Sequence, residues 1–220
     1  MSSALETVGE TGPIPPSSPD AWDERLLAWR WFAHLFRAAP DEATAMSLRD
    51  GEGAAFRDRL AVDPALAPHL AEMRRLVNDY DDARALTRRM GIAFCHLFLG
   101  VGGPSTVAPY ESCHLGEKGR MFDTATADME ALLRRLDIGL AADVHEPADH
   151  ISVELEVMAL LVATDDAEAA PFLERLARWM PSFAAACFAR DPFGFYAAAA
   201  SALEAFVERE RLALGAMNSR

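Results

Sequence analysis

Hydrophobic positions recur along this chain with the period of an α-helix, and the two-residue alternation of a half-buried strand is nearly absent. One stripe near the N-terminus contains Trp22, Leu26, Trp29, Ala33 and Phe36. Their spacing of three or four residues places them on one helix face, which would be buried against a core. The last periodic stretch, from about residue 193 to residue 212, has the same character. The pattern therefore predicts an all-α fold.

Proline and glycine residues indicate where the predicted helices begin and end. Glycines near position 51 divide residues 41–60 into short helical pieces, and Pro64 is expected to start the next helix. The run from Gly100 to Pro104 ends a long helix. Further on, Pro147 is expected to open a helix and Pro181 to interrupt one.

Residues 105–123 show little helical pattern and form the longest predicted loop inside the folded part of the chain. Long loops in compact domains often carry function. The preceding Gly-Val-Gly-Gly run has no following Lys-Ser/Thr and no preceding strand, as a phosphate-binding loop would require. A helix end followed by a sharp turn explains this run better.

Composition and breaks together predict four segments. Residues 1–19, rich in proline and glycine, are expected to be a disordered tail. Residues 143–146 are expected to be a hinge-like connector. The helical part would then be either one domain or an N-terminal lobe of residues 20–142 with a smaller C-terminal lobe of residues 143–214, followed by a flexible tail at residues 215–220.

The charge of the chain narrows the choice of partners. Its 220 residues include 21 Lys and Arg against 34 Asp and Glu, a formal charge of −13. Such a surface repels nucleic acids and anionic lipids and attracts cationic partners. The sequence shows neither a membrane-spanning apolar run nor a secretory leader, and its 3 cysteines do not suggest a disulfide framework. We therefore expect a cytoplasmic protein.

Two kinds of metal site can be considered. Cys95-His96 and Cys113-His114 are adjacent pairs, and neighbouring side chains on a helix point about 100° apart, so a shared zinc ion is disfavoured. His145, His150 and Glu154 could serve a small metal-dependent hydrolase, although the second histidine comes one residue too late for a zincin motif. Acids that complement the dipole at a helix start explain that segment better. We therefore expect no catalytic set, no metal and no cofactor, and keep the hydrolase as the alternative.

Several segments resemble the TorD/DmsD-type chaperones, in the order that this family shows them. The first two are Leu97-Phe98-Leu99-Gly100 and Pro109-Tyr110-Glu111-Ser112, similar to an LF-G…P-x-x-S segment. Residues 146–155, EPADHISVEL, resemble the signature E-P-x-D-H-x-x-x-E-L. Residues 179–183 and 192–196 are also similar, so the resemblance extends from about residue 80 to residue 214. After Ser112 the family tends to have an apolar-aromatic pair, whereas this chain has Cys113-His114.

This resemblance implies a bundle of about ten helices, with an N-terminal lobe and a smaller C-terminal lobe around a hinge. It also implies a chaperone, not an enzyme, that binds the twin-arginine signal peptide of an apo molybdopterin oxidoreductase. The chaperone would assist cofactor insertion and prevent premature export, as a monomer or a domain-swapped dimer. The implied peptide-binding residues are Pro109, Tyr110, Ser112, Glu146, Pro147, Asp149 and His150.

A physical hypothesis accompanies the resemblance. Glu146 and Asp149 would engage the arginines, which favour planar, bidentate contacts with carboxylates. Tyr110 and the apolar flanks of its loop would receive the hydrophobic segment of the signal peptide. His150 would either bind in the peptide site or pack at the helix start. A helical adaptor without a redox client remains a third interpretation, and the sequence does not identify the client molybdoenzyme.

Overall fold

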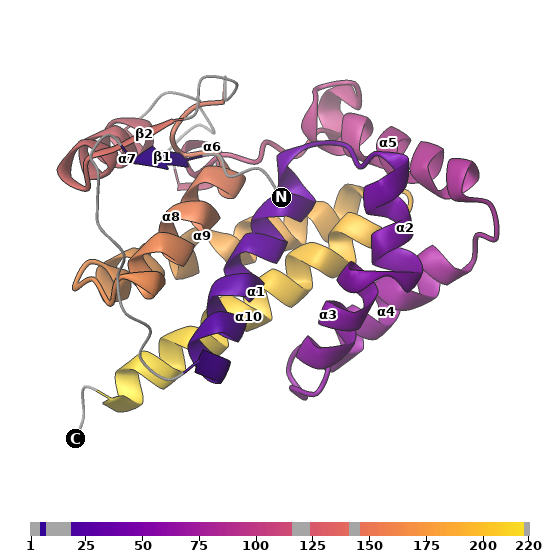
Figure 1. Cartoon of the computed structure of the whole chain (residues 1–220). Helices are drawn as coiled ribbons and strands as arrows, with labels where there is room; N and C mark the ends of the chain where they lie inside the picture. Colours follow the sequence, from indigo (N-terminus) through magenta and orange to yellow (C-terminus); the bar gives the residue numbers. More distant parts are fainter. Residues whose placement is uncertain (1–4, 8–18, 116–123, 141–145, 218–220) are drawn as a thin grey trace. The chain divides into compact units, whose positions relative to one another are not determined.

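The computed structural model describes residues 5–7, 19–115, 124–140 and 146–217, and most of these residues are helical (Figure 1). They form ten α-helices, one short 3-10 helix and two strands of three residues each. The predicted all-α fold is confirmed. No helix within these ranges combines the length and apolarity needed to span a bilayer.

Contacts divide the chain into two compact units. Unit 1 comprises Met1–Arg37 and Pro109–Phe172, and unit 2 comprises Ala38–Ala108 and Leu173–Arg220. Each unit is thus assembled from two separate stretches of sequence. The lobes expected from the sequence divide the chain at a single point near residue 143 instead, and that division stays a prediction.

Unit 1 is built around two long helices. Its elements are β1 (Leu5–Thr7), α1 (Pro19–Arg37), α6 (Glu111–Leu115), α7 (Thr124–Arg135), β2 (Ile138–Leu140), α8 (Ile151–Ala163) and the start, up to Phe172, of α9 (Ala169–Arg190). Helices α1 and α8 make the most extensive contact between elements. Trp29 and Phe32 of α1 are fully buried, and 11 of the 13 residues of α8 are buried, including Glu154 and Glu156. A helix buried on all sides is a core helix.

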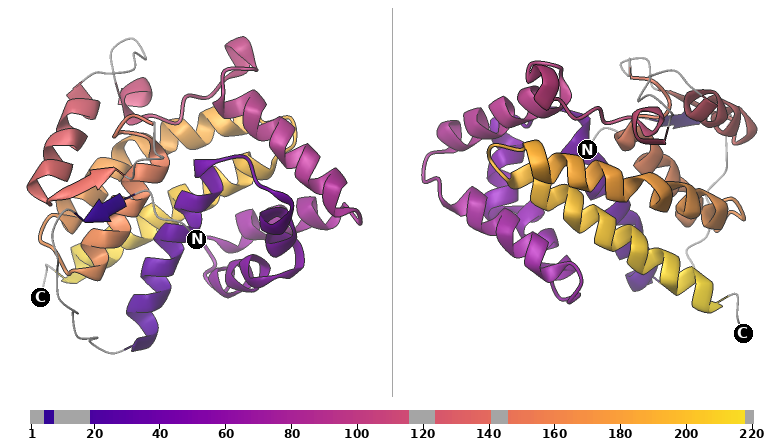
Figure 2. Two further views of the ribbon diagram at one scale, coloured as in Figure 1. Left: turned by 45° about the horizontal axis from the view of Figure 1, so that its top comes forward. Right: turned by 180° about the vertical axis from the view of Figure 1, so that it is seen from behind.

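The two strands of unit 1 were not predicted from the sequence. Strand β1 pairs antiparallel with β2, with Leu5 opposite Leu140, Glu6 opposite Gly139 and Thr7 opposite Ile138. The left view of Figure 2 shows the two arrows side by side. Of the segment predicted as a disordered tail, residues 1–4 and 8–18 lie outside the described residues.

Unit 2 packs its helices around an aromatic cluster. Its elements are α2 (Glu42–Asp50), α3 (Glu52–Leu60), α4 (Ala67–Asn78), α5 (Ala83–Phe98), η1 (Gly103–Ser105), most of α9 (Ala169–Arg190) and α10 (Phe195–Met217). Phe98 of α5 stacks on Phe183 of α9 and meets Tyr196 of α10 edge to face. Phe94 also contacts Tyr196, so these rings join three helices.

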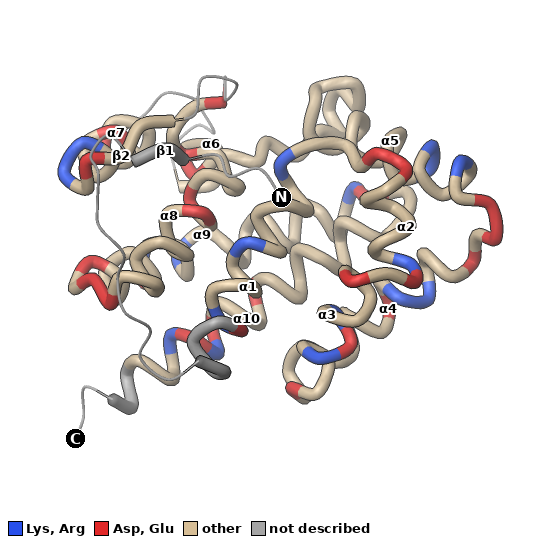
Figure 3. Tube along the Cα trace, in the orientation of Figure 1, with Lys and Arg blue, Asp and Glu red and all other residues tan. Residues whose placement is uncertain are grey.

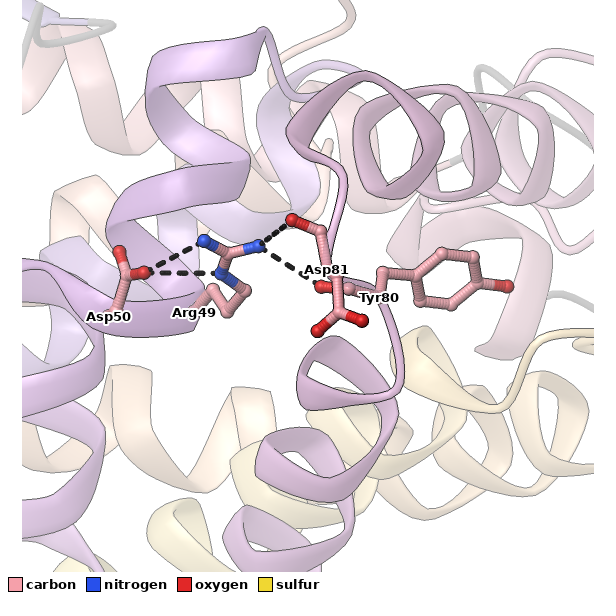
Figure 4. A network of polar contacts seen from close by, with 4 residues as sticks. All are labelled: Arg49, Asp50, Tyr80 and Asp81. Atoms are coloured by element: carbon pink, nitrogen blue, oxygen red, sulfur yellow. Dashed lines mark hydrogen bonds and ion pairs between the residues drawn. The ribbon is translucent and has the colours of Figure 1, made fainter.

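Arg49, at the end of α2, fixes the turn between α4 and α5 (Figure 4). Its Nη1 donates to the backbone carbonyls of Tyr80 at 3.0 Å and Asp81 at 2.9 Å. Its Nε and Nη2 donate to Asp50 Oδ2 at 3.2 and 3.0 Å. One guanidinium therefore satisfies two turn carbonyls while its charge is balanced by a neighbouring acid.

Several predicted boundaries were wrong in instructive ways. Helix α9 continues through Pro181, because the proline is exposed while the adjacent Trp179, Met180 and Phe183 are buried and hold the helix in place. Helices α4 and α8 begin three and four residues after Pro64 and Pro147, respectively. The predicted loop, residues 105–123, begins at the last residue of η1 and contains the short helix α6. The turn at Gly100, with φ of 77°, is confirmed.

Candidate functional site

An antiparallel backbone bridge between Tyr110 and His150 forms the base of the candidate site in unit 1. The amide of Ile151 donates to the carbonyl of Pro109 at 2.8 Å, and the amide of Glu111 donates to the carbonyl of Asp149 at 3.0 Å. These two bonds hold the chain entering α6 against the chain entering α8. Two of the segments that carry the family resemblance, residues 109–112 and 146–155, are therefore brought together, although 36 residues separate Tyr110 from Glu146.

Asp149 connects three elements from a fully buried position. Its Oδ2 accepts a bond from the amide of Ser112 at 3.1 Å, in the first turn of α6. Its Oδ1 accepts one from the hydroxyl of Thr126 in α7 at 2.8 Å. A buried carboxylate is tolerated when such donors satisfy it. Asp149 thus joins α6 and α7 to the start of α8.

His150 is the N-cap of α8. Its Nδ1 accepts from the amide of Ser152 at 3.1 Å and lies 2.8 Å from the Ser152 hydroxyl. Burial lowers the pKa of His150 to about 4, although the nearby acids Glu146 and Asp149 act in the opposite direction. The ring is therefore neutral near pH 7, with an unprotonated Nδ1 as the capping acceptor.

Tyr110 and Glu146 form the accessible side of the site. The Tyr110 hydroxyl donates to Glu146 Oε2 at 2.6 Å, and both residues are half-buried. The Tyr110 ring meets the His150 ring edge to face at 5.2 Å between centroids. Burial, followed by the bond to Glu146, raises the pKa of Tyr110, so the phenol stays protonated and keeps donating. The carboxylate is thus held in place by a neutral partner.

All seven residues singled out in the sequence lie in this part of unit 1, but at different depths. Tyr110, Glu146 and Pro147 are partly exposed, while the other four are buried: Pro109, Ser112, Asp149 and His150. Asp149 therefore does not present a free surface to a peptide in this conformation, contrary to the direct arginine contact in our hypothesis. Thr126 was missed, because a threonine in a helix's first turn carries no distinctive sequence signal.

The residues considered for other chemistry are placed differently. His145 lies outside the described residues, Glu154 is fully buried, and Nδ1 of His150 is occupied as a cap. Burial raises the pKa of the Cys113 thiol, which disfavours the reactive thiolate. Over the described residues, no group of three or more metal-binding side chains is close enough to hold an ion.

The acidic charge is concentrated in the unit that contains the site. Unit 1 has 7 Lys and Arg against 19 Asp and Glu, a formal charge of −12, whereas unit 2 has 14 against 15, a formal charge of −1. Figure 3 shows red positions around α8 and mixed colours from α2 to α5. The net charge that would attract a cationic partner from a distance therefore lies mainly in unit 1.

The fold places the protein in a class. A solved structure from Archaeoglobus fulgidus, assigned as a redox enzyme maturation protein, aligns with a TM-score of 0.53 and 24% identity. The alignment covers 92% of this chain and 99% of the other. This likeness shows that the chain has the same all-helical fold as that protein.

Sequence comparisons then identify the family. The family model described as nitrate reductase delta subunit matches residues 61–185. Chaperone protein TorD of Shewanella loihica is 33% identical over 199 residues, covering 87% of this chain and 93% of that protein. TorD of Photobacterium profundum is 29% identical over 199 residues, covering 84% and 92%. This chain belongs to the TorD chaperone family, whose members are named chaperones, and it is not an enzyme.

Proposed function

We propose that this protein is a cytoplasmic chaperone for an apo molybdopterin oxidoreductase. It binds the twin-arginine leader of that precursor, assists insertion of the cofactor and prevents premature export. One observation carries the proposal: the half-exposed, hydrogen-bonded pair Glu146 and Tyr110 lies in a unit with a formal charge of −12. A cationic, apolar leader is the peptide that complements such a surface.

Glu146 is the group proposed to receive an arginine. Its Oε2 already accepts the Tyr110 hydroxyl at 2.6 Å, which fixes the orientation of the carboxylate before any ligand arrives. A preoriented carboxylate loses less conformational entropy when a guanidinium binds. Arginine also suits this group better than lysine, because its planar fork can contact both oxygens of a carboxylate.

The apolar part of the leader would lie against the neighbouring surface of unit 1. The Tyr110 ring, the half-exposed Pro147 and the 44% exposed Leu115 at the end of α6 offer apolar area in this region. Each leucine or phenylalanine buried there contributes about 1.5–3 kcal/mol. Ordering of the peptide opposes this gain, so we expect a dissociation constant on the order of micromolar. Such affinity allows release for export.

The buried residues have a positioning role in this proposal. Pro109, Asp149 and His150 hold the two site segments together by backbone and side-chain bonds, and Ser112 presents its amide to Asp149. Loss of one of these residues would reduce binding by displacing Tyr110 and Glu146. Tyr110, Glu146 and Pro147 would touch the peptide.

Isothermal titration with a synthetic twin-arginine leader tests this assignment. Wild-type protein should bind with a micromolar constant, and Glu146→Gln should bind about five- to ten-fold more weakly, because one carboxylate–guanidinium contact is lost. Tyr110→Phe should weaken binding less, since it removes the orienting bond but keeps the ring.

Asp128→Asn is the matched control. Asp128 is an exposed acid of α7 in the same unit, so the control makes the same charge change at a residue that is not one of the seven site positions. Its affinity should stay within about two-fold of wild type. Equal weakening in Glu146→Gln and Asp128→Asn would remove Glu146 from the site. Failure of the wild-type protein to bind would contradict the proposed function.

A further inference from the structure

We infer that strand β1 is a built-in competitor, which occupies a backbone edge where an extended segment of the client leader pairs with β2. This inference rests on the proposed function and adds a binding mode to it. Three observations carry it: the pairing of β1 with β2, the contact of β1 with the site helix α8, and the charge of the N-terminal segment.

The pairing shows that the edge of β2 accepts an extended chain. Residues Leu5–Thr7 align antiparallel with Ile138–Leu140 over three residues, from a segment more than 130 positions away in sequence. Backbone bonds between strands do not depend on side-chain identity, and strand addition is a common mode of peptide recognition. A two-stranded ladder of this length is only marginally stable by itself in water. The backbone pairing alone therefore opposes exchange of β1 only weakly.

Strand β1 also contacts α8, the helix whose N-cap is His150. The edge that β1 occupies thus belongs to the same unit as Tyr110 and Glu146, and it leads onto the same core helix. A leader with arginines at Glu146 and an extended continuation along β2 would use both features.

Charge favours exchange of β1 for such a leader. Residues 1–18 contain Glu6 and Glu10 and no Lys or Arg, and the unit to which they belong is itself acidic, with a formal charge of −12. An acidic strand on an acidic unit is held less tightly than a cationic one would be. A twin-arginine leader that displaces β1 brings positive charge to the acidic unit in place of negative charge. A peptide without that charge gains only the backbone bonds to β2 that β1 already makes, so β1 keeps it from the edge.

The test compares full-length variants in titrations with the same synthetic twin-arginine leader. In Leu5→Pro/Glu6→Pro, adjacent prolines must remove a ladder bond, because the amides of neighbouring strand residues point in opposite directions. Gly9→Pro/Glu10→Pro is the matched control, because it also introduces two prolines and removes one acid, but outside β1. Releasing the competitor should raise affinity about three- to ten-fold, and the control should match wild type.

Hydrogen exchange at residues 138–140 supplies a second readout. Without peptide, exchange should be faster in Leu5→Pro/Glu6→Pro than in the wild type, and peptide should slow it again in that variant. Equal affinity in all three proteins, with unchanged exchange at β2, would overturn the competitor and leave the proposed function standing. Absence of leader binding in all three would overturn both.

Discussion

At the scale of single residues, the site contains buried side chains that hold its segments together and partly exposed side chains that a peptide could reach. Asp149 has no exposed surface and bonds to Ser112 and Thr126, while His150 is 4% exposed and caps α8. The sequence identified both residues through the family signature but could not reveal their depth. Burial depends on α6 and α7 closing over the start of α8, and no local pattern near residue 149 contains that information.

The neutral state of the buried His150 predicts how the stability of the fold depends on pH. Its pKa is lowered by burial from 6.5 to about 4, so below pH 6.5 the unfolded chain takes up a proton that the folded chain does not. The free energy of unfolding should therefore fall as pH drops from 6.5 towards 4. In urea unfolding at pH 7 and pH 5, wild type should lose about 2 kcal/mol more than His150→Asn, which keeps a capping acceptor but does not titrate. Equal losses would contradict the buried, neutral histidine.

At the scale of elements, the helices were predictable from the sequence, but their boundaries and the segments that connect them were not. Hydrophobic period located α1 and α10 to within a few residues, because each buries one continuous stripe, and the glycine run from residue 100 marked the end of α5. Helix α9 passes through Pro181 because tertiary packing outweighs the lost backbone bond. Strands β1 and β2 escaped prediction because three residues are too few to show alternation, and their partner is remote.

Arg49 bonds the turn between α4 and α5, and its contribution to the stability of the fold can be measured directly. Arg49→Ala leaves the carbonyls of Tyr80 and Asp81 without their donor, and the Arg49 side chain is only 19% exposed. We expect the free energy of unfolding to fall by about 1–3 kcal/mol in urea titrations. Arg84→Ala is the control, because Arg84 is 88% exposed and lies 4.0 Å from Glu42, so its loss should cost under about 0.5 kcal/mol. Similar effects for both arginines would show that Arg49 does not stabilise the turn.

At the scale of the whole molecule, charge is unevenly divided between the two units. The total of −13 was readable from composition, but its near-complete confinement to unit 1 was not. Unit 1 combines residues 1–37 with residues 109–172, so no single window of sequence shows the contrast. The sequence predicted only that the protein attracts cationic partners, whereas the contacts that define the units indicate which unit would bind a cationic leader.

The central claim is that this acidic unit recognises the two arginines of a leader. Its most direct test is the affinity of the wild-type protein for two leader peptides that differ only in having Arg-Arg or Gln-Gln, each titrated at low and high salt. The account predicts that the Arg-Arg peptide binds about ten-fold or more tightly at about 50 mM salt, and that this advantage shrinks at about 500 mM while the Gln-Gln peptide changes little. Equal affinity of the two peptides at both salt concentrations would contradict it.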